Sequence, residues 1–376
     1  MRKGFLTLLS AALVLLCACH SVRQPEGEAI GKGVSCTAIS RPEGPWEIRV
    51  IRIDRGAEVS IDMVMAHDTL PGRERVSGAV ARIEKQNRRV IAGVNGDFYF
   101  MGNHEKEGLP LGPSVSFGRL FTSGRTHGAF YIDCRGVPHT GSLTFRGTIE
   151  NDGQTFPFEV FNWEGSNAKD KKYVVPDQKQ GSGILVFSNL WGWKIPFRGV
   201  RVRMQEASFE TDGSYTGEVT GPFAAGETVS KDPGSLVIVG LGDTEEAVNR
   251  LKGKVRLSFG FVETVRKLKM AVGSWQVLLK DGKIVVNPGG PRHPRTMIGF
   301  NDREILLVTV DGRRKGWSKG MTSHEQAELL RELGCTEGCN IDGGGSTTAW
   351  VLGKCVNCPS DPSGMRPNAN CILVTE

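Results

Sequence analysis

The sequence lacks the long apolar runs, repeats and biased tracts that mark membrane, fibrous and disordered proteins. The longest apolar run is Phe5 to Leu16, whereas a helix that crosses a bilayer needs about 20 apolar residues. Hydrophobic residues make up 39% of the chain, charged residues 23% and aromatic residues 7%. These are ordinary values for a globular protein, so disorder, collagen and coiled coil are excluded.

A strong charge of one sign is also missing. The formal net charge is +6 over 376 residues, and Arg2 and Lys3 belong to a segment that we expect to be removed. No basic stripe interleaved with aromatic residues occurs, so we expect no nucleic-acid partner.

Three common catalytic motifs are absent as well. The sequence has no Gly-x-Ser-x-Gly turn, no His-Glu-x-x-His helix and no phosphate-binding loop that ends in Gly-Lys-Ser or Gly-Lys-Thr. No cysteine carries the local signature of a catalytic nucleophile. The sequence therefore gives no support to an α/β-hydrolase serine or to a P-loop.

The first nineteen residues predict export. A positively charged start followed by a short apolar run is typical of a secretory signal. The end of this segment, Leu16-Cys17-Ala18-Cys19, resembles a bacterial lipobox, in which a small residue precedes a cysteine that becomes lipidated. We expect a signal peptide at 1–18, a tether at 19–44, and an exported lipoprotein held at a periplasmic or outer membrane surface by Cys19. The alternative is a plain signal peptide without a lipid.

Seven cysteines follow Cys19, and an odd number leaves at least one of them unpaired within the chain. Cys335 and Cys339 form one close pair, and Cys355 and Cys358 form another. An oxidising compartment favours disulfides, but free thiols and a four-thiolate zinc site remain open.

Local patterns predict many strands and a few helices. Trp46 to Arg52 alternates like a strand, and we expect Val59 to Met65 to pair with it. Val76 to Arg89 has helical spacing, and Ile305 to Val310 reads as a buried strand. Asp281-Gly282 is typical of a hairpin turn.

The clearest helix signal runs from Thr322 to Leu333. Thr322 and Glu325 have the spacing of a capping box, and Gly334 stands where a glycine ends a helix.

The middle third, by contrast, consists of short strands separated by turn signals. The predicted fold class is therefore α/β (mixed α+β), with a mixed sheet flanked by a few helices. We expect one domain at 45–376 that contains a β-rich insertion at about 136–232.

Polar residues gather in four places, each directly after a short apolar strand. Strand ends that lead into glycine-rich loops are where sheets with flanking helices usually bind ligands. The four blocks are Asn95-Gly96-Asp97-Phe98-Tyr99, Arg292-His293-Pro294-Arg295-Thr296, Asp311-Gly312-Arg313 and Asn340-Ile341-Asp342-Gly343-Gly344-Gly345-Ser346.

The last block carries the sharpest chemical signal. Backbone N–H groups of the three glycines after Asp342 can face an anion or a sugar beside the carboxylate. Arg295 and Arg313 offer the planar fork that fits phosphate, and His293 can titrate near neutral pH. Each feature also has a plain structural explanation: a tight turn, a solvated arginine or, for Glu325, helix capping.

Taken together, the blocks resemble the phosphodiester glycosidase family in order and spacing. The resemblance covers about residues 45–135 and 270–376 and leaves the middle region unmatched. The matching blocks are Asn95-Gly96-Asp97-Phe98, Arg295-Thr296-Met297-Ile298-Gly299, Asp311-Gly312-Arg313, Gly320-Met321-Thr322 with Glu325, Asn340 to Ser346, and Arg366-Pro367 with Asn370.

The resemblance implies hydrolysis of the bond between the anomeric carbon of a sugar and a phosphodiester. The products are a free sugar, N-acetylglucosamine-like, and a phosphomonoester. Asp342 is the first candidate for the catalytic carboxylate, Asp97 the second and Glu325 the third. The candidates for binding the phosphate and the sugar are Asn95, Gly96, Arg295, Thr296, Asp311, Arg313, Asn340, Gly343, Gly344, Gly345, Ser346, Arg366 and Asn370.

Two other functions remain open from the sequence. One is a surface lipoprotein that binds glycans without cleaving them. The other is a metal-dependent phosphodiesterase with Asp97, Asp311 and Asp342 as ligands. The scarcity of histidines near these aspartates disfavours a transition metal and leaves Ca²⁺ as the possible ion. The glycosidase prediction itself needs no cofactor.

Overall fold

The computed structural model describes residues 27–102, 106–124, 128–163, 183–192, 194–195, 199–209, 214–224, 226–264 and 267–376. The predicted signal peptide at 1–18 and the predicted lipidation site Cys19 lie outside these residues. Within the described ranges, no helix is both long and apolar enough to span a bilayer.

Sheet A joins the N-terminal strands to the C-terminal third of the chain, in the order β1-β2-β3-β22-β21-β23-β19-β20. Its strands are β1 Glu28–Gly31, β2 Val34–Arg41, β3 Trp46–Asp54, β22 Glu304–Val310, β21 Arg295–Phe300, β23 Glu337–Asn340, β19 Gln276–Lys280 and β20 Lys283–Ile284. Residues 28–41, which the sequence assigns to a tether, instead form β1 and β2, because β2 pairs along its whole length with β3.

Sheet B lies next to sheet A and has the order β25-β24-β5-β26-β4. Its strands are β25 Lys354–Cys355, β24 Ala349–Val351, β5 Val90–Asn95, β26 Asn370–Thr375 and β4 Ser60–Met65. The predicted pairing of Val59–Met65 with the strand at Trp46 is wrong, since β4 pairs with the C-terminal strand β26. A strand pattern shows which residues are extended but not which partner completes the ladder.

The two sheets pack face to face, with α3 (Ser323–Glu332) covering the outer face of sheet A and α1 (Val76–Glu84) covering that of sheet B. In β22, Ile305 and Leu307 belong to the core between the sheets, while Leu306 and Val308 pack under α3. Because both faces of this strand are buried, its unbroken apolar sequence is explained.

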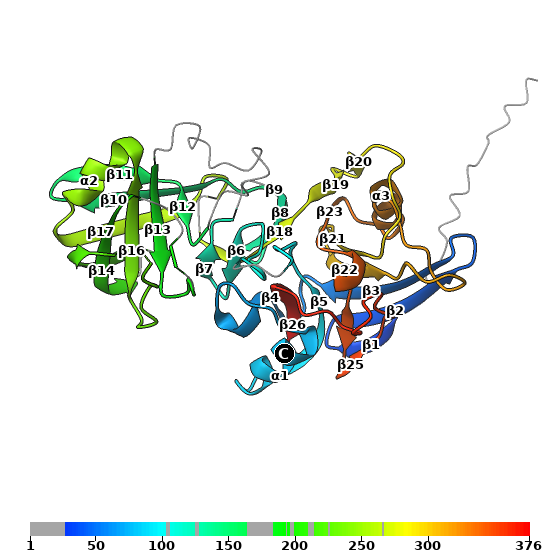
Figure 1. Ribbon diagram of the computed structural model, residues 1–376. Helices are drawn as coiled ribbons and strands as arrows, with labels where there is room; N and C mark the ends of the chain where they lie inside the picture. The colour runs from blue at the N-terminus through cyan, green and yellow to red at the C-terminus, as the bar shows by residue number, and fades with distance from the viewer. Residues whose placement is uncertain are drawn as a thin grey trace, which may run out of the picture.

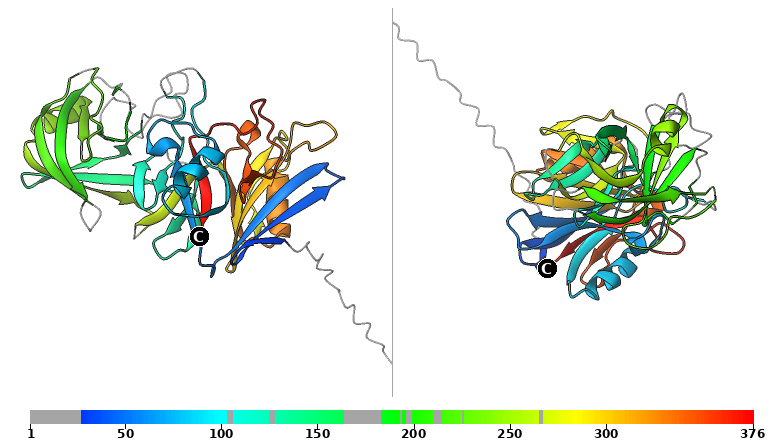
Figure 2. Two further views of the ribbon diagram at one scale, coloured as in Figure 1. Left: turned by 90° about the horizontal axis from the view of Figure 1, so that it is seen from below. Right: turned by 90° about the vertical axis from the view of Figure 1, so that its left-hand side faces the viewer.

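Two further sheets complete the molecule. Sheet C has the order β7-β6-β18-β8-β9, and sheet D has the order β11-β10-β17-β15-β14-β16-β13-β12. Figure 1 and the left view of Figure 2 place sheet D at one end, with sheet C between it and the other two sheets. The strands of sheet C are β6 Ser114–Ser116, β7 Arg119–Thr122, β8 Gly128–Asp133, β9 Pro138–Ser142 and β18 Leu268–Ser274.

Sheet D curls around an apolar core that includes Phe158, Phe161 and Leu257 and that also takes in residues of sheet C. The short helix α2 (Glu245–Asn249) packs against β14 and β16 of this sheet. The strands of sheet D are β10 Phe145–Asn151, β11 Gln154–Phe158, β12 Val160–Phe161, β13 Gly183–Ser188, β14 Val200–Phe209, β15 Tyr215–Pro222, β16 Leu236–Leu241 and β17 Gly253–Phe261. The β-rich character predicted for the middle third is present here.

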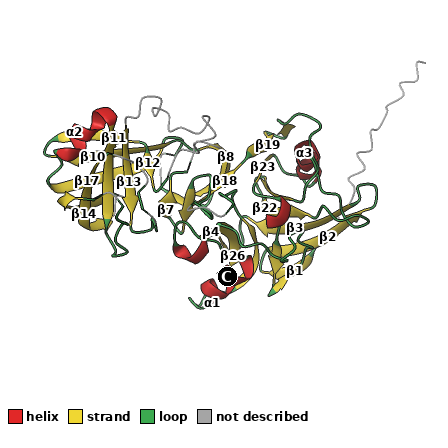
Figure 3. Cartoon of the chain, viewed as in Figure 1, coloured by secondary structure: helices red, strands yellow, loops and turns green. Residues whose placement is uncertain are grey.

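The fold is mostly β, with 50% strand and 11% helix, rather than α/β (Figure 3). The predicted mixed sheet is also replaced by antiparallel ones: among the strand pairs of the described residues, only β12 and β13 run parallel. Parallel neighbours need crossover connections of a dozen or more residues. None of the described α-helices forms such a crossover, because none of them links two parallel strands.

The predicted helix at Thr322 is confirmed together with its capping box. The Thr322 hydroxyl accepts the Glu325 N–H at 3.2 Å, and the Glu325 carboxylate accepts the Thr322 N–H at 2.8 Å. Gly334 follows with φ +89°, the conformation expected of a glycine that ends a helix. The predicted hairpin turn is also present, since Asp281 and Gly282 both have positive φ.

We predict that Thr322→Ala lowers the free energy of unfolding by about 1 kcal/mol, because it removes the oxygen that caps α3. Urea denaturation followed by circular dichroism measures the change. Ser323→Ala, one residue further and without a capping bond, is the matched control. Equal stability of the two variants would contradict the assigned cap.

Candidate active site

Strand ends of sheets A and B meet around the buried side chain of Asn95, the last residue of β5. Its Nδ2 donates to the carbonyl of Asp342 at 2.8 Å. Its Oδ1 accepts the Thr296 hydroxyl at 2.7 Å and the Thr348 N–H at 3.1 Å. One carboxamide therefore fixes the loop of Asp342 against both sheets.

Asp342 follows β23, and its own N–H donates to the carbonyl of Gly96 at 3.0 Å. The carboxylate accepts the N–H of Gly343 at 2.8 Å. Burial raises the pKa of Asp342 to about 6, although the Ser346 hydroxyl and the Gly343 N–H lower it in part. The residue as a whole is partly exposed, although its carboxyl group is buried. A carboxyl with this pKa is mostly ionised at pH 7 and accepts a proton readily.

Two guanidinium groups lie close against the backbone of the glycines after Asp342. A Cβ on Gly344 would stand 3.1 Å from the Arg313 guanidinium nitrogens, and one on Gly345 would overlap the guanidinium of Arg366. Gly344 also has φ +62° and begins the short 3₁₀ helix η3 (Gly344–Ser346). Both arginines add to the forces that hold down the pKa of Asp342.

The positive charge at the site is only partly balanced by carboxylates. Arg366 is held by Asp361 at 2.6 Å. Within the described part of the chain, neither Arg295 nor Arg313 forms an ion pair. Arg295 donates instead to the carbonyls of Met321 and Pro291.

These charges act on one another across the site. Burial, together with the charge of Arg313, lowers the pKa of Arg295. Burial and both arginines also lower the pKa of His293, whose Nδ1 lies 3.3 Å from an Arg313 nitrogen. A group of cations that lacks carboxylate partners attracts an anion.

Asp97 is buried close to Asn95 but faces a different neighbour. Its N–H donates to the Asn370 carboxamide at 2.7 Å, and its carboxylate accepts the Gly112 N–H at 2.6 Å. The α-carbon of Gly273 packs so closely on this carboxylate that a Cβ there would overlap it. Asp97 and Asn370 therefore hold the strand junction beside Asp342.

Asp311 lies just before the arginine loop, but its carboxylate is occupied by the protein itself. It accepts the Asn357 amide, the Cys358 N–H and the Trp317 indole N–H at 3.0–3.1 Å. It orders the loop that carries Arg313 rather than facing open space. Asn340 acts similarly, since its Oδ1 accepts the Gln276 N–H at 3.1 Å and anchors β19.

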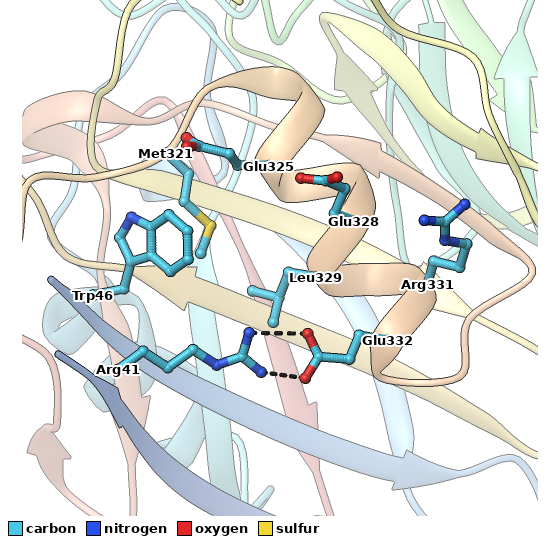
Figure 4. Close-up of a pocket in the computed structure, with 8 residues that line it drawn as sticks. All are labelled: Arg41, Trp46, Met321, Glu325, Glu328, Leu329, Arg331 and Glu332. Atoms are coloured by element: carbon cyan, nitrogen blue, oxygen red, sulfur yellow. Dashed lines mark hydrogen bonds and ion pairs between the residues drawn. The ribbon is translucent and has the colours of Figure 1, made fainter. Parts of the chain in front are cut away.

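Glu325 is the predicted catalytic residue that the structure separates most clearly from the others. Its carboxylate caps α3 and forms an ion pair with Arg292, and both interactions keep its pKa below the usual range. It faces a cavity of about 480 Å³ under α3 that is closed on one side by the Arg41–Glu332 ion pair (Figure 4). The residues that line this cavity are Arg41, Trp46, Met321, Glu325, Glu328, Leu329, Arg331 and Glu332.

Tyr99 is a residue at the site that motif reading did not select. Its hydroxyl donates to the carbonyl of Pro367 at 3.0 Å. Burial and the charge of Asp342 raise its pKa, while Ser346 and Arg366 lower it. The signal in the sequence was its position two residues after Asp97, but only the fold shows that it turns towards Asp342.

Within the described residues, the cysteines and the acidic groups form neither a disulfide nor a metal site. All seven cysteines within the described residues are free thiols. Burial raises the pKa values of Cys335 and Cys339 to about 12, so both are protonated. No group of three or more His, Cys, Asp or Glu side chains in the described ranges is arranged to hold a metal ion.

Part of the chain is similar to a known family. Residues 203–375 match the family model described as phosphodiester glycosidase. The match begins inside the predicted insertion at 136–232 and does not include the Asn95 block. Over 184 residues the chain is 29% identical to the SPbeta prophage-derived uncharacterized protein YomE of Bacillus subtilis (strain 168); this covers 47% of the chain and 26% of YomE.

Two solved structures share the fold. A hypothetical protein from Synechocystis superposes with a TM-score of 0.69 at 20% identity and covers 91% of this chain; the chain spans 61% of that protein. A candidate exported protein of Burkholderia pseudomallei K96243 superposes with a TM-score of 0.63 at 22% identity, covering 88% of this chain and 74% of the other.

We predict that Asp342→Asn makes the protein more stable at neutral pH. Because folding raises the pKa of this carboxyl from 3.8 to about 6, ionisation destabilises the folded state. The resulting loss of unfolding free energy is absent below about pH 4, grows as the pH rises, and reaches at most about 3 kcal/mol above pH 6. An asparagine never carries this cost.

Denaturation of both proteins in urea at pH 7.5 and at pH 4 measures the difference. Asp281→Asn, in the exposed β19–β20 turn, is the matched control and is expected to change nothing at either pH. An equal effect of Asp342→Asn at both pH values would show that Asp342 is not destabilised by burial.

Proposed function

We propose that this chain, whose residues 203–375 match the phosphodiester glycosidase family model, hydrolyses glycosyl-1-phosphodiesters. The bond cleaved is the one between the sugar C1 and its oxygen on phosphorus. The products are a free sugar, N-acetylglucosamine-like, and a phosphomonoester. We further propose that the protein acts on cell-envelope or other glycans while anchored to a membrane through Cys19.

One observation carries the proposal: two arginines that form no ion pair among the described residues lie beside the buried carboxyl of Asp342 and a glycine run. A phosphodiester is an anion, and Arg313 and Arg295, which form no ion pair among the described residues, supply positive charge to bind it. Arg366 lies flat on Gly345 and adds a fixed guanidinium. Cleavage leaves a second negative charge on the phosphate, and the arginines stabilise that charge as it develops.

Asp342 is the group that we assign to the sugar side of the bond. Its carboxylate either attacks C1 or takes a proton from the water that attacks C1. The C1–O bond breaks, and its electron pair leaves with the phosphate oxygen. Water supplies the hydroxyl of the released sugar. A phosphate ester is a good leaving group, so a strong general acid such as Glu325 is not needed at this step.

The test uses the full-length chain and an N-acetylglucosamine 1-phosphodiester, with free sugar and inorganic phosphate assayed separately. We expect free sugar without inorganic phosphate, at an unchanged rate in the presence of chelator. Asp342→Asn removes the activity, whereas Asp281→Asn keeps it. Inorganic phosphate or inhibition by chelator would favour a metal-dependent phosphodiesterase. Sugar binding without any product would favour a glycan-binding protein.

We also predict that Arg313→Ala lowers kcat/KM by about 10²–10³, the usual effect of losing one contact to the charge of a transition state. Arg314→Ala is the matched control, because Arg314 is equally exposed and donates to the carbonyl of Pro359 instead. Steady-state kinetics of both variants with the same substrate measure the ratio. Similar losses in both variants would show that general positive charge, rather than the position of Arg313, matters.

A further inference from the structure

Exposed apolar side chains gather around the candidate active site. Three of the seven large apolar side chains that are exposed among the described residues, Met101, Trp275 and Trp317, contact its residues. The Met101 sulfur lies 3.8 Å from the Arg366 guanidinium, and the Trp317 indole donates to Asp311. Isolated exposed apolar residues are common, but a group around one polar site marks a binding surface.

Trp275 is supported through both its backbone and its ring. It lies in the connection between β18 and β19, and its N–H donates to the carbonyl of Asn340 at 3.2 Å. The next residue, Gln276, donates to the side chain of Asn340. The indole rests beside Phe98 with ring centres 5.5 Å apart, and 47% of Trp275 remains exposed. The contact with Phe98 restricts the indole before any ligand arrives, so binding to it costs less conformational entropy than binding to an unsupported side chain.

The two rings lie next to the segments that hold Asp342. Phe98 follows Asp97, and Gly96 accepts the N–H of Asp342. Asn340, which fixes Trp275, precedes Asp342 by two residues. The arginines contact the glycines that follow Asp342, whereas the backbone of Trp275 is bonded to Asn340, which precedes it. The anion and the apolar surface therefore belong to different parts of the same site.

We propose that Trp275, supported by Phe98, is the platform on which the sugar ring of the substrate lies, and that it makes the site selective for a hexopyranosyl group. This inference rests on the proposed function. A pyranose presents a face of C–H groups, and stacking it on an indole removes apolar surface from water. A simple alkyl phosphodiester offers the arginines the same anion but lacks such a face.

Kinetics with the N-acetylglucosamine 1-phosphodiester test the platform. Trp275→Ala is expected to raise KM about tenfold, because a contact with a large apolar surface is lost, and to change kcat by less than about threefold. Trp275→Phe retains a flat ring and is expected to restore most of the affinity. Val285→Ala, which truncates another exposed apolar residue at the β19–β20 hairpin, is expected to have no effect. An unchanged KM in Trp275→Ala would overturn the proposal.

A binding measurement separates this inference from the proposed function. Saturation-transfer NMR with free N-acetylglucosamine, glucose and galactose needs no turnover. We expect transfer to the ring protons of at least one sugar with the wild type, Trp275→Phe and Val285→Ala, and its loss in Trp275→Ala. If this pattern of sugar binding is found but no substrate is hydrolysed, the platform is supported and the proposed activity is refuted. No transfer in the wild type, or equal transfer in Trp275→Ala, would refute the platform.

Discussion

The carboxamide of Asn95 is the contact on which the site depends. It joins sheet B to sheet A through the Thr296 hydroxyl and holds the Asp342 carbonyl and the Thr348 N–H at the same time. All of these groups are buried or nearly so, and a buried polar group without a partner costs about 1–3 kcal/mol. A carboxamide donates through its nitrogen and accepts through its oxygen, so one side chain serves all three groups. The packing of the two sheets and the position of the catalytic candidate are therefore set together.

Around this fixed point the protein keeps charges that do not favour its own folding. Asp342 is ionised in a place that raises its pKa, and Arg295 and Arg313 repel each other without a carboxylate between them. In a protein selected only for stability, buried charged side chains are paired with opposite charges. An arrangement in which a bound anion supplies the missing charge is typical of a functional site. The apolar ring of Trp275 then adds a surface that distinguishes one anion from another.

Features that depend on near neighbours could be predicted from the sequence. The capping box of α3, the glycine that ends it and the Asp281-Gly282 turn each involve residues within a few positions. The buried strand at Ile305 was predicted for the same reason, since its composition alone shows that both faces avoid water. Features that depend on distant partners could not. The partner of β4 comes from the last residues of the chain, and β1 and β2 replace a predicted tether because sheet A offers them an edge.

The same division holds at the site. The sequence by itself determined that Asp342, a glycine run and several arginines follow strand ends. The type of each residue and its spacing from its neighbours can be read from the sequence without the fold. Only the tertiary structure decided which of these residues share one space. Asp311 is occupied by Asn357 and Cys358, and Glu325 lines a cavity beside α3. Tyr99 comes close to Asp342, and Trp275 rests beside Phe98. The physical reason is that hydrogen bonding and burial depend on contacts between residues far apart in the chain, which no local pattern encodes.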